Sequence, residues 1–154
     1  MSASISFTQE QSRAILGLKP ETLRHWRKLV PYLAQKSGKT ARFSFTDLIC
    51  LAATRQMTET LGMSISSVHQ AVESLFQMMS IAEVQMLQGT VVLIGASAAS
   101  FVSEGETLNS LAVEPTVLIP LGPLIERLQS QVLPGMRFAP QSFLPFSPQA
   151  VTQA

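Results

Sequence analysis

The chain has 154 residues, of which 46% are apolar, and its formal net charge is +1. That length suits one domain of ordinary size, with enough apolar residues for a core. The single cysteine, Cys50, excludes an internal disulfide, and the longest strongly apolar run, at residues 91–96, is far shorter than the ~20 residues of a membrane helix.

Charge is distributed unevenly along the chain. Residues 1–70 contain nine Lys and Arg against four Asp and Glu, a balance of +5, whereas residues 71–154 contain two against six, a balance of −4. This asymmetry predicts that the first half binds a polyanion and that the second half has another task. Because no basic start precedes an apolar run at the N-terminus, we expect no signal peptide and a cytoplasmic location.

Two short helices are predicted near the start of the chain. The stretch TQEQ at residues 8–11 fits a capping box, in which a Thr oxygen and a Gln side chain bond to the backbone at a helix start. Gly17 follows as a turn residue, and Pro20 suits the first position of a second helix over residues 20–28. The pattern therefore predicts a helix, a tight turn and a second helix.

The second helix carries both an apolar face and a basic face. Leu23 and Trp26 are three residues apart and fall on one side of the helix. We expect Trp26 to pack inward as a core aromatic residue, so that the basic residues beside it point outward.

A basic hairpin is predicted after the two helices. Residues 36–45 read KSGKTARFSF, with a Ser-Gly turn signal followed by alternating polar and aromatic residues. We expect a small β-hairpin with Lys36 and Lys39 at its tip. The helix that follows is expected to end at Gly62, in a C-cap position.

Apolar residues from position 65 onward follow a seven-residue repeat. Three heptads are the lower limit for a coiled-coil seam, so residues 64–88 are predicted to form a dimerisation helix. The alternative is that this stripe only covers the core of its own domain, and a separate short helix near Ser80 would break the repeat. The residues predicted to form the seam are Ile65, Val68, Val72, Leu75 and Met79.

The acidic second half has weaker signals. Residues 90–94 and 116–120 are predicted to be short buried strands, and residues 124–132 a helix. We therefore expect a small α/β module at residues 89–133, for oligomerisation or for an effector. Residues 134–154 contain four prolines and no acidic residue, which predicts a flexible, disordered tail that could dock on a partner protein.

Several of these pieces occur in the order and at the spacing of a known family. The chain reads GLKPETLRHW at residues 17–26, RFSF at 42–45, DLICL at 47–51 and LGMSI at 61–65. This pattern resembles the head of the MerR family of DNA-binding regulators over residues 5–70. The resemblance implies a winged helix-turn-helix domain at residues 5–63, and hence a mainly α fold with small β elements.

The resemblance also implies where DNA would bind. It places Arg24 and His25 against the DNA backbone or groove, and Arg42 against the backbone from the wing. An α-helix fits the major groove, and Lys and Arg displace condensed counterions, which supplies much of the affinity. The predicted DNA-binding residues are Lys19, Thr22, Arg24, His25, Arg27, Lys28, Lys36, Lys39 and Arg42.

Catalytic and metal chemistry find little support. Residues 91–100 contain only Gly95 of the three glycines in a dinucleotide-binding loop. The same segment is near the nucleophile-elbow pattern, but no histidine follows His69 to act as a base. Cys50 stands alone, and two histidines are too few for a metal site. We therefore predict that the protein is not an enzyme and binds neither a cofactor nor a metal.

The sequence thus predicts a sequence-specific double-stranded DNA-binding protein, a transcriptional regulator that acts as a homodimer on nucleoid DNA. Two alternatives remain open. An accessory DNA-bending factor, such as an excisionase of a mobile element, would use a similar winged head. An antitoxin or adaptor would bind a protein partner through its second half.

Overall fold

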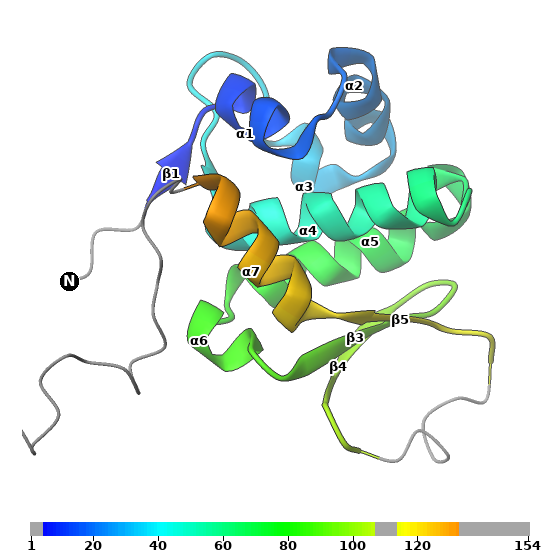
Figure 1. Ribbon diagram of the computed structural model, residues 1–154. Helices are drawn as coiled ribbons and strands as arrows, with labels where there is room; N and C mark the ends of the chain where they lie inside the picture. The colour runs from blue at the N-terminus through cyan, green and yellow to red at the C-terminus, as the bar shows by residue number, and fades with distance from the viewer. Residues whose placement is uncertain (1–4, 107–113, 133–154) are drawn as a thin grey trace, which may run out of the picture.

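Helices form most of the structure, and two small antiparallel sheets lie beside them (Figure 1). The computed structural model describes residues 5–106 and 114–132. For these residues, the predicted mainly α fold with small β elements is confirmed. Within these two ranges, each helix is too short or too polar to cross a membrane.

The first two helices agree with the prediction. Helix α1 spans Gln9–Leu16, and the backbone N–H of Gln11 donates to Oγ1 of Thr8 at 3.1 Å in a complete capping box. Gly17 adopts the left-handed conformation, with φ at 64°, and ends α1. Helix α2 spans Pro20–Leu29 and has its proline at the start, where no N–H is needed.

The hairpin predicted over residues 36–45 is wrong. A short helix, α3 (Pro31–Ala34), follows α2, and a loop then leads to the two-residue strand β2 (Phe43–Ser44). This strand pairs with β1 (Ser6–Phe7) from the start of the chain. Phe43 is fully buried there. Because this strand pairs with β1, it is not available as one arm of the predicted hairpin.

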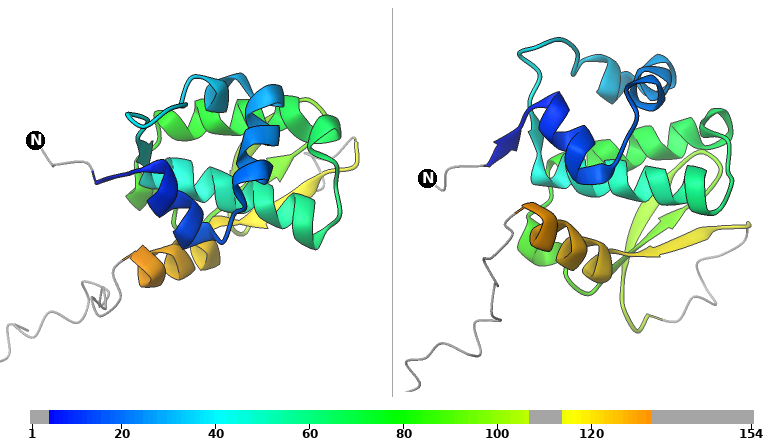
Figure 2. Two further views of the ribbon diagram at one scale, coloured as in Figure 1. Left: turned by 90° about the horizontal axis from the view of Figure 1, so that it is seen from above. Right: turned by 45° about the horizontal axis from the view of Figure 1, so that its top comes forward.

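Two antiparallel helices form the centre of the molecule. Helix α4 (Phe45–Arg55) continues into a π-helical turn, η1 (Gln56–Thr60), and Gly62 reverses the chain with φ at 67°. Helix α5 (Ile65–Ser80) then packs along α4. Figures 1 and 2 show α1–α3 on one side of this helix pair and the three-stranded sheet on the other.

The apolar stripe of α5, which follows a seven-residue repeat, packs inside a single chain. Its five predicted seam residues are each 5% exposed or less and belong to the main hydrophobic cluster. These side chains are therefore not on the surface, and they cannot meet a second copy unless this core opens. The stripe covers the core of its own chain, as the alternative interpretation proposed. The five residues are Ile65, Val68, Val72, Leu75 and Met79.

The second half adds a sheet and a helix to the same core. The sheet has the order β4-β3-β5, and all its pairings are antiparallel. Helix α7 packs against α4 and β3, so the buried residues of both halves form one cluster. Strand β4 was not predicted, because small residues dilute its apolar pattern. The elements are α6 (Val84–Leu87), β3 (Thr90–Ile94), β4 (Ala99–Ser103), β5 (Val117–Pro120) and α7 (Leu121–Val132).

The predicted strands and helix of the second half thus occur close to their expected positions, and a short helix does follow Ser80. The tail predicted at residues 134–154 lies outside the described residues.

Candidate nucleic-acid interface

Helix α2 is anchored by its apolar face and exposes its basic face. Leu23 is fully buried and Trp26 is 2% exposed, which confirms the predicted inward packing of the indole. Arg24, His25 and Lys28 are exposed on the other sides of the same helix. Because the two buried side chains fix the rotation of α2, its cationic side chains are held outward.

Two further predicted contacts lie at the start of α2. Lys19 is the residue that precedes the helix and is exposed, whereas Thr22 is half-buried in its first turn.

Arg27 was predicted to bind DNA, and the structure gives its guanidinium partners within the protein. Its Nε and Nη2 donate to the backbone carbonyl of Lys36, at 3.1 and 2.7 Å, and Nη2 also donates to Oε1 of Gln9 at 2.6 Å. Burial lowers the pKa of Arg27 from its ordinary value. Arg27 therefore ties α2 to α1 and to the following loop, and it positions the surface rather than extending from it.

Lys36 was predicted at the tip of a wing, and the structure turns its ammonium inward. Its Nζ lies 2.6 Å from Oδ2 of Asp47, whose side chain is 2% exposed. The same nitrogen donates to the carbonyl of Arg42 at 3.0 Å and lies 5.3 Å from the centre of the Tyr32 ring. Burial, followed by the hydrogen bond to Asp47, raises the pKa of Tyr32. Lys36 thus closes the loop against the core.

The remaining two cations of this loop stay at the surface of the protein. Lys39 and Arg42 are both exposed. Nη1 of Arg42 donates to the carbonyls of Lys39 and Ala41, at 3.2 and 3.0 Å, which stiffens the loop around it. A loop with two exposed cations therefore stands where the sequence predicted a basic hairpin.

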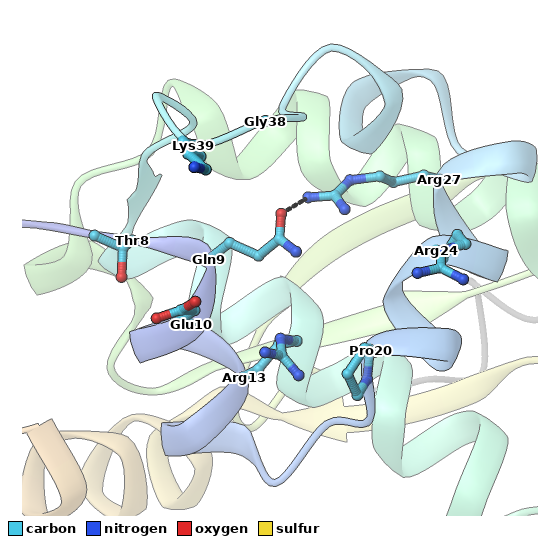
Figure 3. Close-up of a pocket in the computed structure, with 9 residues that line it drawn as sticks. All are labelled: Thr8, Gln9, Glu10, Arg13, Pro20, Arg24, Arg27, Gly38 and Lys39. Carbon is cyan, nitrogen blue, oxygen red and sulfur yellow. Dashed lines mark hydrogen bonds between the residues drawn. The ribbon is translucent and has the colours of Figure 1, made fainter.

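A cleft of about 540 Å³ lies between α1, α2 and this loop (Figure 3). Four of its lining residues are cationic and one is acidic. Figure 3 shows Arg24 and Arg27 reaching from α2 toward α1, and Arg13 beside Pro20. The lining residues are Thr8, Gln9, Glu10, Arg13, Pro20, Arg24, Arg27, Gly38 and Lys39.

Arg13 was missed by the sequence reasoning. It is a lone base on α1, and its position on the face toward α2 becomes visible only when the two helices are packed together. The sequence offered one signal for Arg13: it follows Gln9 by four residues, so the two side chains lie on the same face of the helix.

Cys50 takes no part in this surface. Its side chain is fully buried on α4, where burial and the nearby Asp47 carboxylate raise the pKa of its thiol. Among the described residues, no three His, Cys, Asp or Glu side chains are grouped so that they could hold a metal ion.

Two short helices joined by a tight turn, the second with an exposed cationic face, are the arrangement typical of helix-turn-helix proteins that bind DNA. Residues 8–75 match the family model of the MerR HTH family regulatory protein, so this part of the chain is similar to that family, in agreement with the resemblance seen in the sequence. The match runs from the cap of α1 into α5 and includes the whole cationic surface. No curated protein and no solved structure matches the chain.

Proposed function

We propose that the protein is a sequence-specific double-stranded DNA-binding regulator of transcription, acting on nucleoid DNA in the cytoplasm. The carrying observation is the geometry of α2, which holds Arg24, His25 and Lys28 outward while Leu23 and Trp26 are buried. A short helix pinned in this way can enter the major groove with its exposed side chains facing base edges.

The two parts of the surface would contribute differently to binding. Arg24 and His25, on the helix, are the candidates for contacts with base edges. Lys39 and Arg42 lie on the loop that takes the place of a wing, and they suit backbone phosphates. Their contribution to affinity would then be the same for most DNA sequences.

A selection experiment tests this proposal. Duplexes that the wild-type protein binds would be enriched from a random library, and affinities would be measured by fluorescence anisotropy at several salt concentrations. Arg24→Ala should weaken binding to the selected duplex by about tenfold or more and relax its specificity, whereas Arg42→Ala should weaken all duplexes evenly. No enrichment, together with affinities that do not depend on salt, would disprove the proposal.

The proposal includes a homodimer that uses residues other than the buried stripe of α5. One head reads few base pairs, and two heads related by a two-fold axis read two half-sites. Large exposed apolar side chains after α5, Ile81 at 87% and Met86 at 74%, offer contact area. Sedimentation at micromolar concentration should show a dimer, and the selected duplexes should contain an inverted repeat. Ile81→Ser should shift the equilibrium toward monomer.

A further inference from the structure

A cleft with exposed apolar side chains lies along the outer edge of strand β5, beside the π-helical turn η1. It has a volume of about 450 Å³, and all four residues of β5 line it. Successive side chains of a strand point to opposite faces, so a cleft that touches all four follows the edge of the strand. Two large apolar residues that line it are exposed, Leu61 at 57% and Leu118 at 44%. Exposed apolar side chains gathered at a cleft are typical of a binding site.

The backbone of β5 presents hydrogen-bonding groups at this edge. Because the N–H of Gly95 donates to the carbonyl of Ala98 at 2.9 Å, the odd-numbered residues of β3 are the ones that bond to β4. The even-numbered residues of β3 therefore bond to β5, at Val117 and Ile119. The N–H and the carbonyl of Leu118 then point away from β3, and among the described residues no strand pairs with that side of β5. Such an edge can accept one more extended segment.

A second cleft continues from the first to the place where the described chain ends. It has a volume of about 250 Å³ and shares Gln56, Thr60 and Arg127 with the cleft at β5. Gln131, in the last turn of α7, also lines it, and the described residues end at Val132. Helix α7 begins where β5 ends (Figure 1). The two clefts, together called the α7 groove, therefore lead from the end of α7 back to the edge of β5.

The rest of the chain is long enough to return through the α7 groove. Helix α7 has 12 residues, so it is about 18 Å long, a distance that about six residues of extended chain can span. Residues 133–154 follow the helix and begin LPGMRF, in which Pro-Gly is a turn signal. Counted from Met136, directly after this turn, an extended segment reaches β5 near Phe143.

The composition of residues 133–154 suits both parts of the α7 groove. This segment contains four prolines, three phenylalanines and no acidic residue. An extended proline-rich segment makes no internal backbone hydrogen bonds, so its carbonyls need donors from elsewhere. The side chains of Gln56, Arg127 and Gln131 can donate near the end of α7. The exposed apolar side chains at β5 can cover an aromatic ring.

We propose that residues 136–146 dock in the α7 groove of their own chain, with Phe143 against Leu61 and Leu118. The docked segment bonds to the outer edge of β5 and covers the apolar side chains there. The β5 strand of a second copy is a poorer occupant, because it has only four residues and Pro120 has no N–H to donate.

Docking also bears on the helix-turn-helix. Leu16, at the end of α1, and Arg55 both line the part of the groove near the end of α7. Arg55 donates to the carbonyl of Leu16, directly before the turn at Gly17. The docked segment therefore lies against the residues that hold the turn between α1 and α2.

Hydrogen exchange of the full-length protein tests the docking. The N–H of Leu118 faces away from β3, so it exchanges slowly only if the segment covers it. Phe143→Ser should raise the exchange rate of this amide by about tenfold or more and leave that of Val92, in the central strand, unchanged. Gln149→Ser, in the same segment but beyond the docked part, is the control and should change neither rate. Equal rates for Leu118 in the wild type and in Phe143→Ser would overturn the docking.

A nitroxide label locates the segment independently. Ser147→Cys places the label directly after the docked part, and the buried Cys50 should stay unlabelled in the folded protein. The label should broaden the amide signals of η1 and β5 in nitrogen-15 spectra. Leu61→Ser should reduce this broadening, whereas Ile81→Ser, which removes an exposed apolar side chain outside the groove, should not.

A mixed sample decides whose segment is docked. Labelled protein without nitrogen-15 is mixed with unlabelled protein that carries it, and docking within one chain predicts no broadening in this mixture. Broadening in the mixture would assign the groove to the segment of a second copy and overturn the assignment to its own chain. An absence of broadening in either sample, or equal effects of Leu61→Ser and Ile81→Ser, would overturn the docking itself. These experiments contain no DNA, so their outcome is independent of the proposed function.

Discussion

Nζ of Lys36 lies 2.6 Å from Oδ2 of Asp47, and this pair joins the loop after α3 to the start of α4. The same carboxylate accepts from the hydroxyl of Tyr32 at 2.7 Å and from the backbone N–H of Ser44 at 2.9 Å. Asp47 is therefore a buried hub that fixes the loop carrying Lys39 and Arg42. Asp47 is not part of the cationic surface, but it fixes the loop that carries two of its residues.

Removing this carboxylate should destabilise the fold. Asp47→Ala breaks the capping box of α4 and leaves the Tyr32 hydroxyl without its acceptor. We expect a loss of about 2 to 4 kcal/mol in the free energy of unfolding, since caps contribute about 1 kcal/mol and broken buried pairs cost more. Urea denaturation measures it. Lys36→Met is the control and should cost less, because the carboxylate keeps two donors; equal losses would contradict the hub.

Arg27 and Lys28 are neighbours on α2 with opposite expected roles. Arg27→Leu should lower stability by about 1 to 3 kcal/mol, because the carbonyl of Lys36 and the amide of Gln9 lose their donor. Lys28→Leu should leave stability unchanged and weaken binding to the selected duplex, since its side chain is exposed. Thermal melts and anisotropy on both variants check this. The reverse pattern would make Arg27 the DNA contact.

Leu75 distinguishes a core stripe from a seam between chains. It is 1% exposed within one chain, so Leu75→Ala should cost about 2 to 4 kcal/mol of folding free energy and leave the distribution of oligomers unchanged. Gln77→Ala, on the exposed side of α5, is the matched control and should have little effect. A variant that stays folded but dissociates in sedimentation would restore the seam.

Local signals in the sequence predicted helices α1 and α2 and the turn between them well. The capping box at Thr8, the turn at Gly17 and the proline at the start of α2 depend on residues within one or two turns, so they can be read directly. Trp26 was also predicted correctly, because an aromatic residue three positions from a leucine defines a helix face.

The sequence predictions failed where a partner distant in the sequence determines the position of a side chain. The ammonium of Lys36 faces Asp47, eleven residues away, and the guanidinium of Arg27 bonds to Gln9, eighteen residues away. Neither partner can be identified from local composition. The apolar stripe of α5 has the same ambiguity. A heptad pattern looks the same in the sequence whether its residues pack against a second chain or against the core of their own chain. Arg13 needed the packed geometry of α1 and α2.

Cys50 should be chemically inert in the folded protein. Its burial raises the thiol pKa, so the thiol stays protonated at pH 8, and the thiolate is the reactive form. Iodoacetamide should therefore modify Cys50 only after the protein is unfolded in guanidinium, as measured by mass spectrometry. Modification at the same rate with and without denaturant would show that the side chain is accessible and would leave a redox role open.

Gly17 and Gly62 offer a matched pair of substitutions at helix ends. Their φ angles are 64° and 67°, so alanine is strained by about 1 kcal/mol or more at either site. A Cβ at Gly17 would also lie 3.2 Å from Nη1 of Arg55, which donates to the carbonyl of Leu16, whereas a Cβ at Gly62 meets nothing within 4 Å.

Gly17→Ala should therefore lower the free energy of unfolding more than Gly62→Ala does, and it should weaken DNA binding because the turn sets the angle between α1 and α2. Arg55→Ala combined with Gly17→Ala should remove the excess cost, since the group that crowds the new Cβ is absent. Urea titrations of the three variants and of Arg55→Ala alone complete the double-mutant cycle. Equal costs at the two glycines would show that backbone conformation alone decides, and that Arg55 does not constrain the turn.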